Sequence, residues 1–336
     1  MSVFATATGV GSWPGSTPRE AAEIVIGELH RLPHLVELPD RGVGADLIGR
    51  AGGLLVDISI DTVTRGYRIA ARPGAVMRRA RSLLDEDVDA LEEAWEKAGG
   101  GEPGRTVKVQ APGPITLAAQ LELANGHRAI TDAGAVRDLT ASLAEGVSRH
   151  RAEVSRRLST TVVVQFDEPL LTVALAGRLT GVTALSTVHP VDETRYISLL
   201  DECVAAAGGE AILHSCAADL PWKALLRSTI SAVSLDIGTL GADDLDGLGE
   251  FVDSGRTVML GVVPALAPAR VPSVEELAAA AVAVTDRLGF ARAVLRDRIG
   301  ISPACGLAGA TDAWARSAIG LAQRVAEVMA SEPESI

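Results

Sequence analysis

Residues 161–169, TVVVQFDEP, join a run of β-branched side chains to a polar end that finishes in proline. The run predicts a buried strand over 161–166, and the long Ala/Leu-rich stretch before it predicts a helix over 135–158. The same alternation of short β-branched runs and longer helical stretches continues through nearly the whole sequence. This alternation is typical of βα units around a parallel sheet.

Counting outward from this stretch gives eight candidate strands. They cover 3–8, a less defined position either near Leu35 or over 54–60, then 106–110, 161–166, 211–214, 232–236, 257–261 and 299–302. Further helices are predicted over 193–207, 274–288 and 312–329. Eight strands with interleaved helices favour a (β/α)8 TIM barrel, formed as a single α/β domain over 1–336, above an open doubly wound sheet.

Composition narrows the class of protein. The chain has 336 residues with 43 acidic and 31 basic side chains, so its formal net charge is −12. We therefore expect neither nucleic acid nor an anionic membrane as the main partner, because both attract a basic surface. The longest apolar run, 277–284, is too short to span a bilayer, and the first residues do not resemble a signal peptide. Three cysteines do not suggest a disulfide framework, which favours a reducing cytoplasm.

Polar and sulfur-bearing residues follow the predicted strands, where the active sites of barrels lie. His214 and Cys216 are two apart on an extended segment, so their side chains face the same side. Cys305 follows another strand, and closure of a barrel could bring it to the same axis. Imidazole and thiolate are ligands that Zn²⁺ prefers, although a free cysteine is often only a small buried hydrophobe. From the pattern alone, both interpretations stay open.

Asp167 and Glu168 form an acidic pair at the end of the strand over 161–166. Such a pair can hold a substrate ammonium or exchange protons, or it can cap the next helix. Because side chains alternate along a strand, only one of the two should point into the barrel mouth. Asp167 is in phase with Gln165, and we expect it to be that one.

The N-terminal loop carries a Gly9-x-Gly11 pattern. A dinucleotide fingerprint needs a third glycine where Pro14 stands, so this interpretation is rejected. A tight turn that offers backbone N–H groups and the Ser12 hydroxyl to a small carboxylate fits better. Cys203, inside a predicted helix, is most simply a core thiol.

Taken together, these motifs resemble the catalytic, C-terminal half of cobalamin-independent methionine synthase, in the superfamily that also holds uroporphyrinogen decarboxylase. The similar segments are 10–14 (VGSWP), 165–169 (QFDEP), 214–216 (HSC) and 302–307 (SPACGL). The resemblance implies that Ser12 binds the carboxylate of homocysteine and that Asp167 binds its amino group. It also implies that His214, Cys216 and Cys305 hold a zinc ion.

Two further roles follow from the resemblance through looser alignment. Asp236 stands where the family has a glutamate that ligates zinc, which would make it a fourth ligand and a catalytic residue beside Asp167. Glu37, or alternatively Asp40, matches a family glutamate that touches the substrate amine. The family histidine on the loop before residues 271–275 (VPSVE) has no counterpart here, and the chain is too short to hold the family's N-terminal folate-binding barrel.

The function implied is zinc-dependent transfer of a methyl group to the thiol of homocysteine, which gives methionine. The donor stays open between a methylated folate and a methyl-donor protein such as a corrinoid protein. One alternative is an alkyl or methyl transferase that uses another thiol acceptor. The other is an inactive barrel that binds a small ligand or a partner protein. A porphyrinogen decarboxylase is disfavoured, because its mouth would need arginines for several carboxylates.

Overall fold

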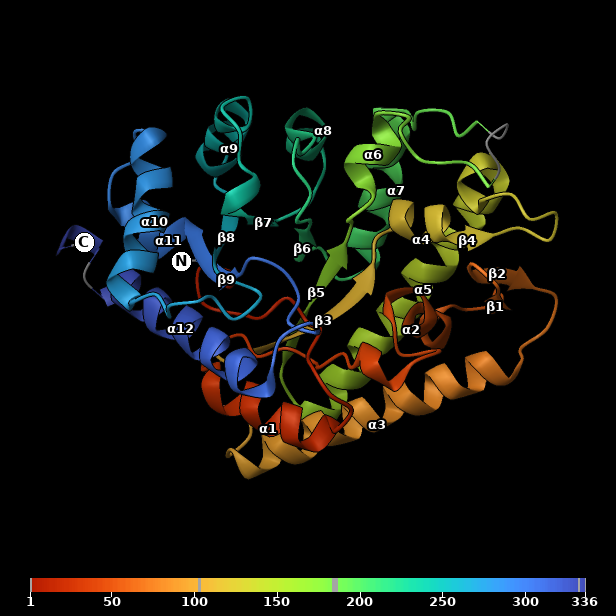
Figure 1. The fold of residues 1–336 in the computed structure, drawn as a ribbon, viewed down its shortest axis with the longest axis horizontal. Helices are drawn as coiled ribbons and strands as arrows, with labels where there is room; N and C mark the ends of the chain where they lie inside the picture. The colour runs from red at the N-terminus through yellow and green to blue at the C-terminus, as the bar shows by residue number, and fades with distance from the viewer. Residues whose placement is uncertain (1, 102–103, 183–186, 332, 336) are drawn as a thin grey trace.

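The computed structural model describes residues 2–101, 104–182, 187–331 and 333–335. At its centre is a curved sheet of six parallel strands in the order β3-β5-β6-β7-β8-β9 (Figure 1). Their bounds are β3 (Thr106–Pro112), β5 (Thr161–Asp167), β6 (Ala211–His214), β7 (Ala232–Asp236), β8 (Thr257–Val263) and β9 (Ile299–Pro303). Each coincides within a few residues with a predicted strand, because these are the β-branched runs of the sequence.

Two extended segments of the N-terminal region continue the sheet beyond both of its edges. Next to β9, Thr8 N donates to Ile301 O at 3.1 Å. Next to β3, Leu35 N donates to Lys108 O at 2.8 Å. The two segments also pair with each other, since Ser12 and Glu37 form a parallel bridge. The ring therefore closes through eight parallel positions, and the predicted barrel class is confirmed.

At the first position of the ring the structure differs from the prediction, and at the second it decides between the two predicted alternatives. The segment 3–8 forms no regular strand: the chain starts in a turn in which Ala5 N donates to Ser2 O at 3.1 Å, and only Ala7 bridges to β9. The second position lies near Leu35, so its alternative over 54–60 is wrong. Those residues instead leave helix α2 (Leu47–Leu54) and enter an antiparallel hairpin outside the barrel, β1 (Ser59–Val63) with β2 (Gly66–Ala70).

Helices cover the outside of the barrel. The predicted helices are found as α5 (Ala133–Leu158), α7 (Glu193–Ala206), α10 (Val274–Arg287) and α12 (Asp312–Ser331). The others are α1 (Pro18–Glu28), α3 (Ala75–Lys97), α4 (Pro114–Gln120), α6 (Leu171–Leu175), α8 (Trp222–Arg227), α9 (Asp244–Asp253) and α11 (Ala293–Arg298), and a two-residue strand, β4 (Leu121–Glu122), pairs with β2. Among the described residues, no helix combines the length and apolar character needed to cross a membrane.

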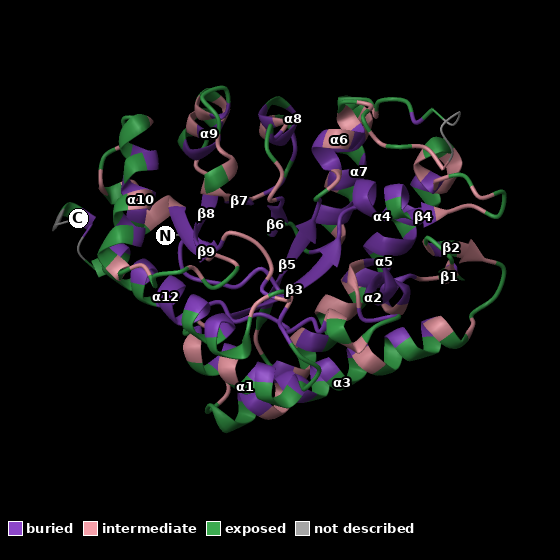
Figure 2. Cartoon of the chain, in the orientation of Figure 1, coloured by how far each residue is buried: buried purple, intermediate pink, exposed green. Residues whose placement is uncertain are grey.

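The interior of the barrel changes from apolar to polar along its axis. One layer is a separate apolar cluster of Phe4, Leu32, Val163, Ile212, Ala232 and Met259. Toward the carboxyl ends of the strands, inward positions become polar: Gln165 pairs in register with Ile212, and Asp167 pairs with His214. The six central strands are buried except at exposed Thr161, which starts β5, and half-buried Asp236, which ends β7 (Figure 2). The apolar layer thus closes the barrel from below and leaves a polar mouth above it.

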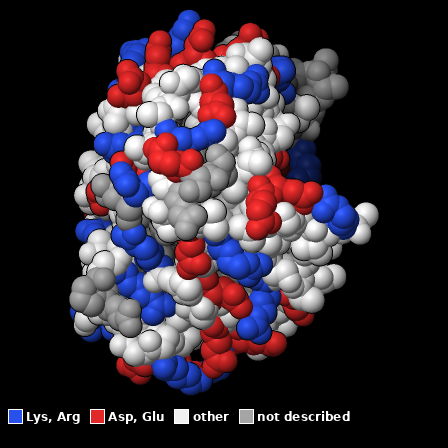
Figure 3. All heavy atoms as spheres, turned by 90° about the vertical axis from the view of Figure 1, so that its left-hand side faces the viewer, with Lys and Arg blue, Asp and Glu red and all other residues white. Residues whose placement is uncertain are grey.

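The outer surface carries charges of both signs. On the face shown in Figure 3, Lys and Arg side chains are intermixed with Asp and Glu side chains over the helices. Surface ion pairs of the described chain include Arg270 with Glu276 at 2.8 Å and Arg292 with Asp286 at 2.7 Å. Exposed pairs of this kind contribute little to stability, and the intermixing gives this face no single sign of charge.

Candidate active site at the carboxyl ends of the strands

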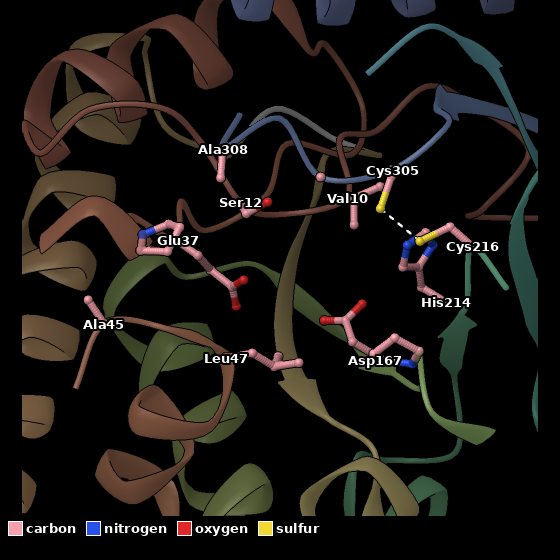
Figure 4. Close-up of a pocket in the computed structure, with 13 residues that line it drawn as sticks. Val10, Ser12, Glu37, Ala45, Leu47, Asp167, His214, Cys216, Cys305 and Ala308 are labelled. Atoms are coloured by element: carbon pink, nitrogen blue, oxygen red, sulfur yellow. Dashed lines mark hydrogen bonds between the residues drawn. The ribbon is translucent and has the colours of Figure 1, made fainter. Parts of the chain in front are cut away.

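A cavity of about 280 Å³ opens where the barrel strands end. It is bordered by six residues that the sequence singles out: Ser12, Glu37, Asp167, His214, Cys216 and Cys305. In Figure 4 the carboxylates of Glu37 and Asp167 and the sulfurs of the two cysteines border the same space. Residues far apart in the sequence meet here because parallel strands end on one side of the barrel.

One wall of the cavity is the thiol–imidazole cluster, which consists of His214, Cys216 and Cys305. His214 is the last residue of β6, and Cys216 follows it by two positions. Cys305 follows the end of β9 by two positions. The ligand atoms of the three side chains all lie within 4.8 Å of one another. Three such donors around one point could hold a metal ion and leave a position for a further ligand.

The ring of His214 is oriented for ligation. Its Nδ1 lies 3.1 Å from Ser234 Oγ on the neighbouring strand, while Nε2 is buried without a hydrogen-bond partner. With the proton on Nδ1 donated to Ser234, Nε2 keeps a free lone pair for a ligand. A second hydrogen bond of this kind fixes the tautomer of metal-binding histidines, so the residues present fit a metal ion.

The two thiols of the cluster share one proton. Their sulfurs are 2.8 Å apart, at hydrogen-bonding distance rather than bonded, and both cysteines are free. The hydrogen bond from Cys216 lowers the pKa of Cys305 to about 4, and the His214 ring acts in the same direction. The pKa of Cys216 is raised, first by this hydrogen bond and then by burial. The lowered pKa of Cys305 favours its thiolate, the form that binds metals.

Asp236 lies apart from this cluster. It ends β7, and its Oδ1 accepts a hydrogen bond from Gly238 N at 2.8 Å, which caps the short 3-10 helix η3 (Ile237–Thr239). Its carboxylate belongs neither to the group of three ligand atoms nor to the residues that border the cavity. The structure thus brings together three of the four predicted ligands.

A second wall is the carboxylate pair, Glu37 and Asp167, which adjoins the cluster because Asp167 is the register partner of His214. Both residues are 7% exposed, and burial raises the pKa of each carboxyl group, that of Asp167 to about 7. Behind Glu37, Arg50 Nε lies 3.5 Å from Glu37 Oε1, and Arg50 Nη1 donates to Asp87 Oδ2 at 2.5 Å. Two carboxylates beside an open cavity are suited to a ligand that carries an ammonium group.

The neighbours of this pair point elsewhere. Glu168 caps α4 from outside the barrel, where its carboxylate accepts from Ile115 N at 2.9 Å and Thr116 N at 2.8 Å. A side chain at Gly113 would collide with that carboxylate. Asp40, the alternative to Glu37, is exposed and accepts from Gly15 N at 3.2 Å. The alternation along β5 therefore turns Asp167, not Glu168, into the cavity.

Ser12 borders the cavity between the two walls. Its backbone carbonyl accepts from Leu307 N at 2.9 Å, which ties the N-terminal loop to the segment that follows Cys305. Gly306 allows this approach, since a Cβ at that position would overlap Ser12 Oγ. The hydroxyl is thus held close to both the cluster and the carboxylate pair.

Reasoning from the sequence missed the buried cation beneath the carboxylate pair. Lys108 is fully buried inside the barrel, where Nζ donates to Val10 O at 3.0 Å and Gln165 Oε1 at 2.7 Å. The sequence holds one signal for it: Lys108 is one of only three lysines and lies within a predicted strand. A charged residue inside a strand is ordinarily a surface position, and only closure of the barrel makes this one interior.

Comparisons with known proteins agree with this geometry. The family model described as the catalytic domain of cobalamin-independent synthase matches residues 4–328. A solved B12-independent methionine synthase from Shewanella sp. W3-18-1, in complex with selenomethionine, superposes with a TM-score of 0.63. It is 14% identical in sequence, with 100% of both chains covered. No curated protein matches the chain. Because the family model covers nearly the whole sequence, the chain belongs to the family of cobalamin-independent synthase catalytic domains.

Proposed function

We propose that this protein is a zinc-dependent S-methyltransferase that methylates the thiol of homocysteine to form methionine. The observation that carries the proposal is the pairing, in one cavity, of the thiol–imidazole cluster with the carboxylate pair. The cluster suits the sulfur of the substrate, and the carboxylates suit its ammonium. Membership of the cobalamin-independent synthase family supports the same reaction.

His214, Cys216 and Cys305 would hold the zinc ion. When bound, zinc lowers the pKa of a coordinated thiol, so that the acceptor sulfur is a nucleophile at neutral pH. Ser234 keeps the lone pair of His214 Nε2 available through its contact with Nδ1. Asp236 would provide a fourth ligand only if its carboxylate turned toward the cluster, where Oδ2 is the oxygen not engaged by Gly238 N.

Glu37 and Asp167 would bind the ammonium of the amino acid, and Ser12 would donate to its carboxylate. These contacts orient the substrate so that its sulfur faces the cluster, which converts the methyl transfer into a reaction between positioned groups. The selenomethionine bound by the similar synthase is an amino acid of this size and charge. Burial of the carboxylates strengthens their attraction for an ammonium.

The donor is a methylated folate or a methyl-donor protein, and we place the enzyme in the reducing cytoplasm, where both metal-binding thiols stay reduced. The test is a donor screen with zinc-loaded protein, L-homocysteine and either methyltetrahydrofolate or a methylated corrinoid, with methionine detected by mass spectrometry. We expect methionine from one donor and none after removal of zinc. Zinc-loaded protein that binds no thiol and forms no methionine would refute the proposal and favour a binding protein.

A further inference from the structure

A buried lysine links the two ends of the proposed substrate site. Lys108 is in the middle of β3, and its register partner Val163 belongs to the apolar layer of the barrel interior. The side chain therefore points to the barrel axis and reaches toward the cavity from below. Its Nζ donates to the carbonyl of Val10 and to the amide oxygen of Gln165.

Gln165 connects Lys108 to Asp167 of the carboxylate pair through hydrogen bonds. Its Nε2 donates to Asp167 Oδ1 at 2.7 Å and to Val10 O at 2.7 Å. The contact with Val10 fixes the orientation of the amide, because a backbone carbonyl can only accept and Gln165 therefore turns Nε2 toward it. Lys108, Gln165 and Asp167 thus form a directed chain of hydrogen bonds that we call the strut.

The strut also holds the loop that carries Ser12. Val10 O accepts from both Lys108 and Gln165, and Val10 precedes Ser12 by two residues. The strut therefore joins Asp167, proposed to bind the substrate ammonium, to the loop that carries Ser12, proposed to bind the substrate carboxylate. The distance between these two groups depends on the same buried ammonium.

A charge in this position is costly for the fold. Burial lowers the pKa of Lys108 to about 7, while the nearby Asp167 and Glu37 act in the opposite direction. A methionine of similar length would fill the same space without desolvating a charge, and such replacements are often neutral or stabilising. A costly buried charge next to a binding cavity is a candidate for a functional role.

We propose that Lys108 is a positioning residue, which through Gln165 sets Asp167 and the Ser12 loop at the spacing of an α-amino acid. The inference rests on the proposed function and goes beyond it by naming what makes the site selective for amino-acid thiols. Lys108 does not touch the substrate. Its removal should weaken recognition of the amino-acid end and leave capture of a bare thiol unaffected.

The experiment compares two thiols on the zinc-loaded full chain by titration calorimetry. L-homocysteine uses the whole site, whereas 3-mercaptopropan-1-ol has neither ammonium nor carboxylate. The variants are Lys108→Met, which removes the charge, and Gln165→Glu, which keeps the size and the acceptor for Lys108 but removes the donor to Asp167 and Val10. Lys223→Met, at an exposed lysine of α8, is the matched control. Zinc content and melting temperature are measured for each protein.

We expect both site variants to retain zinc and to bind L-homocysteine at least about tenfold more weakly, with mercaptopropanol affinity changed less than about threefold. Lys223→Met should match the wild type with both thiols. Equal weakening for the two thiols, or unchanged homocysteine binding, would overturn the positioning role. If Lys108→Met does not fold, Gln165→Glu decides the question. A wild-type protein that binds neither thiol would instead refute the proposed function, and this inference with it.

Discussion

The two walls of the cavity differ in what compensates their buried charged and polar groups. The carboxylate pair is balanced by cations of the chain itself, Lys108 below Asp167 and Arg50 behind Glu37. The thiol–imidazole cluster consists of electron-pair donors that face one another: two sulfurs 2.8 Å apart and the unpartnered Nε2 of His214. The charges of the carboxylates are thus compensated by side chains of the protein, whereas the lone pairs of the cluster are suited to a cation that binds from outside.

This difference predicts how each wall responds to change. A residue of the cluster acts with the others around one ion, so its loss should abolish metal binding and activity together. A residue of the carboxylate pair acts on one end of the substrate, so its loss should lower affinity and leave the metal in place. The predictions below test that separation, from the largest expected effect to the smallest.

Replacing a thiol of the cluster should have the largest effect. We expect Cys305→Ser to lose most of its zinc and about a thousandfold of methyl transfer, because metal polarisation of the acceptor is worth several kcal/mol. Zinc is measured by inductively coupled plasma mass spectrometry and turnover by methionine formation. Cys203→Ala, at the buried cysteine of α7, is the control and should keep its zinc. A full complement of zinc in Cys305→Ser would show that the thiol–imidazole cluster does not hold the metal.

Replacing a member of the carboxylate pair should have a smaller and different effect. Asp167→Asn keeps the shape and loses the charge, so we expect KM for L-homocysteine to rise about 10- to 100-fold, as for loss of a hydrogen bond to a charged group. Zinc content should stay at the wild-type level. Loss of zinc from this variant would show that the two walls are not separate.

Lowering the pH should weaken zinc binding, because zinc and a proton compete for the sulfurs of the cluster. The hydrogen bond between the sulfurs raises the pKa of Cys216 and lowers that of Cys305, so we expect the pair to hold one proton at neutral pH. Zinc has to displace this proton, so apparent zinc affinity should fall about tenfold for each unit by which pH is lowered from about 8 to 6. Competition with a chromophoric chelator measures the slope. Asp167→Asn should show the same slope, and a flat wild-type profile would contradict the shared proton.

The smallest effect is expected at Ser12, between the walls. Ser12→Ala removes one hydrogen bond to the substrate carboxylate, which costs about 1.5 kcal/mol, so KM for L-homocysteine should rise about tenfold with kcat and zinc content unchanged. Steady-state kinetics with 3-mercaptopropan-1-ol as a second acceptor provides the control, since this thiol has no carboxylate. An equal change for both acceptors would place Ser12 outside carboxylate recognition.

The sequence predicts the strands of this barrel where local pattern and tertiary structure agree. Strand β6 is found at its predicted bounds, Ala211–His214, because a short apolar run can only be buried there. The segment 3–8 is different: its one bridge, from Ala7 to Ile301, depends on a strand almost 300 residues later in the chain. Such a pairing leaves no local signal, so its irregularity could not be foreseen.

Within the cavity, too, some features follow from the local pattern and others depend on tertiary structure. The side of the strand on which Asp167 lies follows from alternation alone, and the meeting of Cys305 with His214 follows from the barrel class. The orientation of Asp236 could not be predicted in this way. Its carboxylate can also cap a nearby backbone N–H, as it does at Gly238. Lys108 was missed because its burial is a property of the closed ring and not of β3.

The account depends most on an ion held by one imidazole and two thiolates with a position open to the substrate sulfur. X-ray absorption at the zinc edge, recorded on the loaded protein before and after addition of L-homocysteine, tests this directly. We predict two sulfur neighbours at about 2.3 Å before addition and three after it. An unchanged sulfur count, or a shell of nitrogen and oxygen alone, would contradict the account.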